Sequence, residues 1–161
     1  MFILPHKVTL EPYVRAFQYK VLNSILYTNS KLYQIGYSQH DLCTFCKSHP
    51  EKLNHFLFSC PFSKAFWDDF ELFWFSGTQK TIKLTQQDVI VGVLTRSCPL
   101  LNYLLLIAKI YLWDCRRSQI HPNINGFKAK ILIKYETENY IGRMNKKMKF
   151  LRAKWANFQF C

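Results

Sequence analysis

Residues 43–60, CTFCKSHPEKLNHFLFSC, hold four potential metal ligands in a short stretch. Their spacing is C-x2-C-x8-H-x4-C, from Cys43, Cys46, His55 and Cys60. Two cysteines separated by two residues can turn both sulfur atoms toward one ion, and a Cys3His set completes the tetrahedral shell of a structural zinc. His55 and Cys60 would fit a helix end that uncoils slightly to deliver both side chains. We therefore expect one structural Zn2+ on these four residues.

Other donors and an ordinary core are the alternatives to this site. His49 lies three residues after Cys46, but it stands in a loop beside Pro50, where we expect it to be exposed. The four residues could also be buried cysteines and a core histidine, although four ligands so close together favour a metal. Three isolated cysteines are not expected to bind: Cys98, Cys115 and Cys161. Three aromatic residues would form a dry shell around the thiolates: Phe45, Phe56 and Phe58.

On both sides of this stretch, apolar residues recur at steps of three and four, which predicts helices. Pro12 and Pro99 each open such a pattern, because a proline at a first helical turn loses no hydrogen bond. The expected stripes are Val14, Phe17, Val21 and Ile25; Leu53, Phe56, Leu57 and Cys60; Phe62, Phe66, Phe70 and Phe73; residues 99–117; Phe127, Ile131 and Tyr135; and Met144, Met148, Leu151, Trp155 and Phe158. Thr85 and Asp88 form a helix-capping pair before another apolar run. Sustained alternation is missing, so the sequence predicts an all-α domain with one Cys3His zinc knuckle between the first helices.

Composition favours one folded core in a reducing compartment. The chain has 161 residues, of which 49% are apolar and 17% aromatic, so it must bury a sizeable apolar surface. We expect no signal peptide, and Asn102 and Lys109 interrupt the longest apolar stretch, which is too short for a membrane span. Six cysteines without a secretory signal favour thiols or a metal site. A nuclear or cytoplasmic location is expected.

The net charge is +12, and residues 121–161 carry 9 basic and 2 acidic side chains. Such a cationic end favours polyanions, nucleic acid first. Six basic residues interleave with an apolar stripe and are the predicted phosphate contacts: Arg143, Lys146, Lys147, Lys149, Arg152 and Lys154. Lys47, Lys52 and Lys64 could extend this footprint around the knuckle. The alternatives are a solvated surface helix and a helix lying on a membrane surface.

Residues 15–26, 42–46, 55–60 and 66–67, together with Glu51, resemble the zinc-binding region at the C-terminus of LINE-type (non-LTR) retrotransposon reverse transcriptases. Lys52 stands where that family often has Thr. The resemblance implies the same four zinc ligands and a role in holding template RNA or target DNA beside a polymerase. It covers about residues 12–75, which we take as the zinc-binding module, and residues 76–161 as a helical extension with a basic tail.

No catalytic constellation is expected. Phe66-Trp67-Asp68-Asp69 has the letters of a polymerase aromatic-x-Asp-Asp motif, but helical flanks favour two carboxylates on the polar face of a helix. The chain is also too short for polymerase and endonuclease domains. We therefore expect a non-enzymatic nucleic-acid-binding module. The alternatives are a protein-interaction module that docks a polymerase body through Phe66, Trp67 and Trp74, and a retrotransposon remnant without activity.

Overall fold

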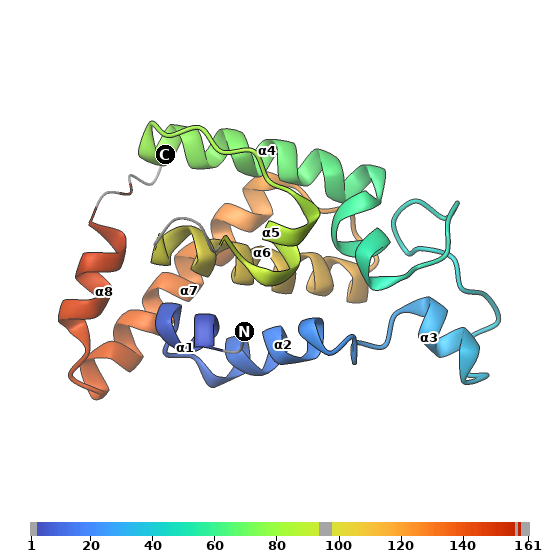
Figure 1. Ribbon diagram of the computed structural model, residues 1–161, viewed down its shortest axis with the longest axis horizontal. Helices are drawn as coiled ribbons and strands as arrows, with labels where there is room; N and C mark the ends of the chain where they lie inside the picture. The colour runs from blue at the N-terminus through green and yellow to red at the C-terminus, as the bar shows by residue number, and fades with distance from the viewer. Residues whose placement is uncertain (1–2, 94–97, 157, 159–161) are drawn as a thin grey trace.

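The computed structural model describes residues 3–93, 98–156 and 158. The elements found there are α1 (Ile3–Val8), α2 (Pro12–Leu22), α3 (Asn29–Gln34), the π-helix η1 (His55–Ser59), α4 (Pro61–Thr78), α5 (Gln86–Val91), α6 (Pro99–Arg117), α7 (Ile124–Met144) and α8 (Met148–Trp155) (Figure 1). These ranges contain no β-strand, only an isolated bridge between Leu42 and Pro50. The predicted all-α class is confirmed. Ile25 lies beyond the end of α2 and is exposed, so its place in the first predicted stripe was wrong.

The central helix is α6, which begins and ends where the sequence predicted. Every side chain from Leu100 to Leu112 is buried, and α1, α2, α7 and α8 all contact the helix (Figure 1). Residues all around α6 can be apolar because neighbouring helices cover every side of it. No helix in the described part of the chain has the length and apolarity to cross a membrane.

The two polar residues inside α6 hold α5 in place. The Asn102 amide accepts a hydrogen bond from the Val93 N–H at 2.8 Å and donates to the Val93 carbonyl at 3.1 Å. Lys109 donates to Gln18 Oε1 at 2.5 Å and to the Ile90 carbonyl at 3.3 Å. Buried polar groups need such partners. The residues that break the apolar run therefore satisfy backbone groups around the end of α5, whose Thr85–Asp88 capping box is present as predicted.

An aromatic core lies between α4 and α7. Phe66, Phe70 and Phe73 on α4 each lie within 6.1 Å of the Phe127 ring, measured between centroids. Phe62, expected in the same stripe, is instead 39% exposed and stacks on His121 at 4.1 Å. The buried side chains of residues 12–75 and 76–161 form one continuous core. The division at residue 75 stays a prediction, and α4 itself continues to Thr78.

The predicted last helix was wrong in its extent, because the chain turns between α7 and α8. Asn145 ends α7, and Lys146 has a positive φ of 55°, which no helix accommodates. Met144, expected in the apolar stripe, lies on α7 and is 69% exposed, whereas Leu151 and Trp155 on α8 are buried. The turn allows α8 to fold back against α7 and α6.

A buried ionic cluster joins the two ends of the chain. Lys154 on α8 pairs with Glu138 on α7 and donates to the Val8 carbonyl at 3.0 Å. The same Glu138 carboxylate accepts from the Thr9 hydroxyl at 2.8 Å and from the Leu10 N–H at 3.3 Å. Glu138 and Lys154 are nearly inaccessible to solvent. The short N-terminal helix α1, which the sequence did not predict, is thereby fixed to α7 and α8.

Candidate metal centre and basic surface

The first two ligands lie in a tight loop between α3 and η1. The Cys43 N–H donates to the His49 carbonyl at 2.8 Å, and the Lys47 N–H donates to the Cys43 carbonyl at 2.9 Å. Lys47 adopts a positive φ of 55°, which closes the turn after Cys46. The loop therefore folds back on itself and places both sulfur atoms on one side.

His55 and Cys60 come from the ends of one π-helical turn. The Cys60 N–H donates to the His55 carbonyl at 2.8 Å, which is the i to i+5 bond that defines this geometry. A π turn is wider than an α turn, so residues five apart can present their side chains to the same point. The expected local uncoiling is therefore a π-helix. Cys60 then caps α4, which starts at Pro61.

The four donor atoms converge as a zinc site requires. The sulfur atoms of Cys43, Cys46 and Cys60 and a ring nitrogen of His55 all lie within 4.8 Å of one another. The Cys43–Cys60 sulfur separation is 3.9 Å, and Cys46 Sγ lies 3.3 Å from His55 Nε2. Zn–S bonds of about 2.3 Å in a tetrahedron put sulfur atoms about 3.8 Å apart. The residues therefore fit a zinc-type ion, which would tie the loop to the start of α4.

The local electrostatics favour a thiolate at Cys60. A hydrogen bond from Cys43 and the backbone N–H groups of Ser63 and Phe62 at the start of α4 lower the pKa of Cys60 to about 7, against the opposing effect of burial. The same sulfur–sulfur hydrogen bond, together with burial, raises the pKa of Cys43. Burial lowers the pKa of His55, and electrostatic repulsion from His49 lowers it further. Both effects favour the neutral form of the His55 ring. A neutral imidazole and thiolates are the forms that bind zinc.

Glu51 supports the loop from behind. Its carboxylate is fully buried and accepts hydrogen bonds from the Thr44 N–H at 2.7 Å and the Asn29 N–H at 2.8 Å. Arg116 on α6 donates to Glu51 from Nε at 2.7 Å and to Asn29 Oδ1 from Nη2 at 2.8 Å. One carboxylate thus joins the ligand loop, α3 and the central helix. The sequence indicated Glu51 through the family resemblance but gave no signal for Arg116, which is 65 residues away.

Two of the three aromatic residues expected around the centre are buried. Phe45 and Phe56 are buried with centroids 5.5 Å apart, and Phe56 meets Trp113 edge-on at 5.8 Å. Phe58 is half-buried. Phe45 and Phe56 belong to the same buried cluster as Cys43 and Cys60, whereas Cys46 is half-buried.

The remaining donors lie outside the four-ligand group. His49 is exposed, with its ring centroid 5.4 Å from that of His55. Cys98 lies directly before α6 and Cys115 lies on it, and neither belongs to the four-ligand group. Cys161 lies outside the described residues. No described residue other than the predicted four joins this metal-ligand group.

This geometry agrees with a similarity between part of the chain and a family of known proteins. Residues 4–67 match the family model described as zinc-binding in reverse transcriptase. That segment is similar to the reverse-transcriptase zinc-binding family. It contains all four ligands and Glu51, and it ends inside α4. No curated protein and no solved structure matches the chain.

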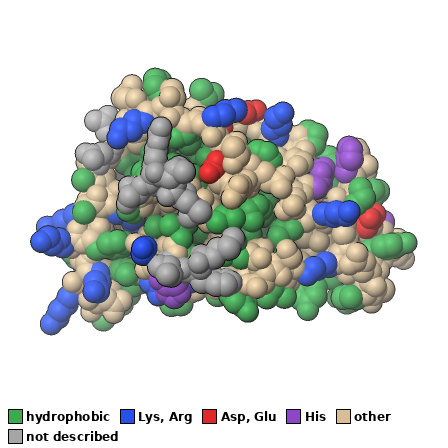
Figure 2. All heavy atoms as spheres, viewed as in Figure 1, with side chains coloured by type: hydrophobic (Ala, Val, Ile, Leu, Met, Phe, Trp, Pro, Cys, Tyr) green, Lys and Arg blue, Asp and Glu red, His purple; other side chains and the backbone are tan. Residues whose placement is uncertain are grey.

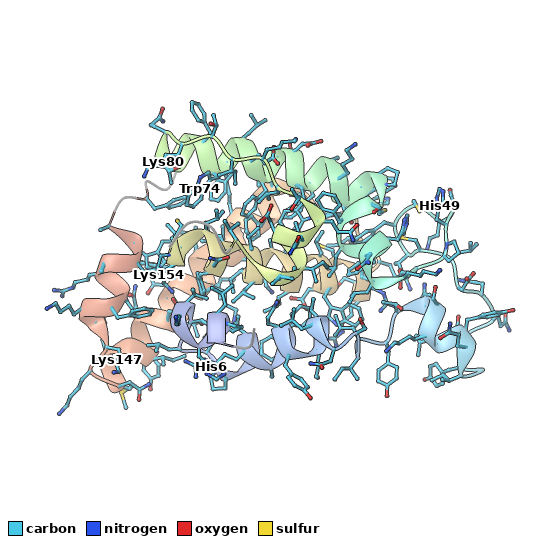
Figure 3. The ribbon with its side chains drawn as sticks, viewed as in Figure 1. His6, His49, Trp74, Lys80, Lys147 and Lys154 are labelled. Atoms are coloured by element: carbon cyan, nitrogen blue, oxygen red, sulfur yellow. The ribbon has the colours of Figure 1, made fainter. Side chains whose placement is uncertain are left out.

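The predicted basic set divides in two. Arg143, Lys146, Lys147, Lys149 and Arg152 are all exposed around the α7–α8 turn, and we call these five residues the basic turn. Lys154 is only 7% exposed and is paired with Glu138, so the structure places it in the interior and not on this surface. In the face shown, the α7–α8 end carries Lys and Arg side chains and no Asp or Glu (Figure 2). The basic turn and the metal centre lie at opposite ends of the molecule, as the labels Lys147 and His49 show (Figure 3).

Two further expectations concern α4. Phe66, Trp67 and Trp74 were candidates for a docking surface, but all three are buried at 4% exposure or less and cannot form one. Trp67 donates from Nε1 to the Leu57 carbonyl at 2.7 Å and so fixes η1 to α4. Asp68 and Asp69 lie on the exposed face of α4, as expected for a polar helix face.

Proposed function

We propose that this chain is a non-catalytic, zinc-stabilised module that binds nucleic acid, RNA or DNA, mainly through phosphate contacts. The observation that carries the proposal is a closed four-ligand centre within the segment that matches reverse-transcriptase zinc-binding proteins, in a chain that also presents the basic turn. A LINE-type origin is part of this proposal. So is the inference that the module holds template RNA or target DNA beside a polymerase.

Zinc would have a structural role here. Four protein donors leave no open position for water or substrate, so such an ion crosslinks the chain and activates nothing. The ligand loop, α3 and α6 already share the hydrogen bonds of Glu51, so the ion would stiffen a region that is joined to the core. We propose that nucleic acid meets the surface of a rigid helical body.

The test is a salt titration of binding. Fluorescence anisotropy of the zinc-loaded chain would be measured with an RNA hairpin, single-stranded DNA and duplex DNA. We expect the logarithm of the binding constant to fall linearly with the logarithm of salt concentration, with a slope of about 0.7 to 0.9 per phosphate contacted. Absence of binding at low salt by folded, zinc-loaded protein would overturn the proposal.

A matched pair of variants locates the contact. Lys146→Gln/Lys147→Gln removes two charges from the basic turn, and Lys80→Gln/Lys83→Gln removes two exposed charges elsewhere. Lys80 lies above Lys147 at the same end of the molecule, outside the α7–α8 turn (Figure 3). We expect the first pair to reduce the salt slope and the second to leave it closer to the parent value. Equal effects would mean that only net charge matters.

The second candidate is docking to another protein, such as a reverse-transcriptase body. It is favoured by a row of exposed apolar side chains on α7, formed by Ile133 (66%), Tyr140 (67%) and Met144 (69%). Self-association that Ile133→Asp abolishes, in a chain that ignores nucleic acid, would support this candidate over the first. Sedimentation velocity at several concentrations measures it.

A further inference from the structure

The helix α3 is held to the protein by polar bonds and not by an apolar core. Ser30 is its only buried residue, and its first residue, Asn29, is fixed by Glu51 and Arg116. The helix lies at the end of the molecule away from α8 (Figure 1).

A hollow of about 310 Å³ lies beside α3. It is lined by the α2–α3 turn, by one face of α3 and by the residues that precede η1, and its polar lining includes Ser24, Ser30, Lys31, Lys52 and Asn54. No acidic side chain lines it. Lys31 donates to the Ser24 carbonyl across the turn, which holds its ammonium group at the rim. Two cationic side chains with no carboxylate beside them favour an anionic group.

One lining residue has an unused hydrogen-bonding group. Ser30 is only 8% exposed, and its buried hydroxyl oxygen has no hydrogen-bond partner in the described part of the structure. Nearly all buried polar atoms in proteins are paired. Because this oxygen is almost inaccessible to solvent, it would pair with a ligand oxygen in the hollow only after the side chain rotates.

Exposed tyrosines flank this hollow along the chain. Tyr27 stands between two lining residues and is 61% exposed, Tyr33 precedes a third and is 53% exposed, and Tyr37 is 81% exposed. Exposed tyrosine rings are common stacking surfaces for unpaired bases. Residues 12–40 contain no Asp or Glu. The combination of rings, lysines and missing acids is complementary to a strand whose bases are unpaired and whose backbone is anionic.

We propose that the α3 face, defined as the hollow together with Tyr27, Tyr33 and Tyr37, binds single-stranded nucleic acid. A backbone phosphate enters the hollow between Lys31 and Lys52, and adjacent bases stack on the tyrosine rings. This inference rests on the proposed nucleic-acid-binding function and adds its strandedness and a second site, at the opposite end from the basic turn. In a duplex the bases are already paired and stacked on one another, so they are not available to stack on the tyrosine rings.

The test compares removal of the tyrosine rings with removal of the tyrosine hydroxyl groups alone. The zinc-loaded full chain would be titrated against fluorescein-labelled oligo(dT), oligo(rU) and a duplex of equal length. Tyr33→Ala/Tyr37→Ala is expected to weaken single-strand binding by about tenfold or more, because stacking depends on the ring. Tyr33→Phe/Tyr37→Phe keeps the rings and is expected to stay within about twofold of the parent. Duplex binding should be the same in all three proteins. Zinc content and thermal melting confirm that each variant is folded.

Charge and contact are tested separately. Lys31→Gln/Lys52→Gln is expected to weaken single-strand binding more than Lys80→Gln/Lys83→Gln, which removes the same charge elsewhere. Photo-crosslinking of the parent chain to a single strand that contains 5-bromouracil should label the tryptic peptides 21–31 and 32–47. Unchanged binding by the Ala variant, or crosslinks confined to residues 143–152, would overturn this inference alone. No binding of any nucleic acid by the parent would overturn the proposed function as well.

Discussion

Glu51 and Arg116 form an ion pair behind the metal centre, with Arg116 Nε 2.7 Å from Glu51 Oε1. The Glu51 side chain is fully buried and that of Arg116 is 10% exposed. The same carboxylate also accepts a hydrogen bond from the Thr44 N–H, so the ion pair fixes the ligand loop relative to α6. Groups that orient a ligand loop affect metal affinity without touching the metal.

The first prediction follows from this pair. Glu51→Gln keeps the shape of the side chain but leaves Arg116 without a counter-charge. It also places an amide N–H₂ group, which can only donate, where the surrounding N–H groups need an acceptor. We expect zinc affinity to fall by about tenfold or more. The free energy of unfolding should fall by about 2–4 kcal/mol. Chelator competition and urea denaturation measure the two quantities. Glu136→Gln, on the exposed surface of α7, is the control and should change neither.

The second prediction concerns the ligand set. Cys60→Ser replaces one of the four donors with a hydroxyl, so we expect the chain to lose its bound zinc and to melt at a lower temperature, because metal binding and folding are coupled. Cys98→Ser, at a half-buried cysteine outside the group, should keep the metal. Elemental analysis after gel filtration, with a thermal melt, makes the comparison. Full zinc content in Cys60→Ser would disprove the assignment.

Local signals predicted much of the fold and the candidate centre. Pro99 marks the start of α6, the Thr85–Asp88 pair caps α5, and the spacing of the cysteines and His55 identified the four residues that converge. Each of these depends on residues close together in the chain. Periodicity and capping therefore suffice for them.

Partners from distant segments could not be predicted in this way. Lys154 looks like its exposed basic neighbours in sequence, and only Glu138 and the Val8 carbonyl make its burial favourable. Phe62 fits the α4 stripe by spacing, yet it stacks on His121, which arrives from beyond α6. The break between α7 and α8 lets α8 contact α6, a partner from a distant part of the chain. A helical pattern indicates which residues share a face, and not which face meets a charge from another helix.

The third prediction tests the buried pair of Glu138 and Lys154. Glu138→Ala leaves the Lys154 ammonium inside the protein without its carboxylate and the Thr9 hydroxyl without its acceptor. We expect the free energy of unfolding to fall by about 3–5 kcal/mol. Glu138→Ala/Lys154→Met should recover part of this loss, because no unpaired charge then remains. Urea denaturation of the four proteins in a double-mutant cycle measures the coupling. Additive losses would mean that the two side chains do not interact.

The fourth prediction is a pH dependence that originates at Lys109. The side chain is fully buried in the middle of α6, and burial lowers the pKa of its ammonium group to about 7. An unfolded lysine keeps its proton to about pH 10. Between these values the unfolded state therefore holds a proton that the folded state lacks, and the free energy of unfolding rises with pH. Below pH 7 both states are protonated, and the cost of the buried charge is fully present.

Lys109→Met removes this titration and leaves an unbranched side chain that is one atom shorter. The Ile90 carbonyl loses the Lys109 donor but still accepts from Gln18 Nε2 at 2.8 Å, so Gln18 Oε1 is the acceptor left without its partner. We expect the variant to gain stability relative to the parent at pH 6. That advantage should shrink by up to about 1.4 kcal/mol per pH unit as pH rises from 7 toward 10. Denaturation of zinc-loaded proteins at pH 6, 7, 8 and 9 measures the difference, in which titrations common to both proteins cancel. Lys80→Met, at an exposed lysine, should give a curve parallel to that of the parent. If Lys109→Met is parallel as well, Lys109 does not titrate in this range.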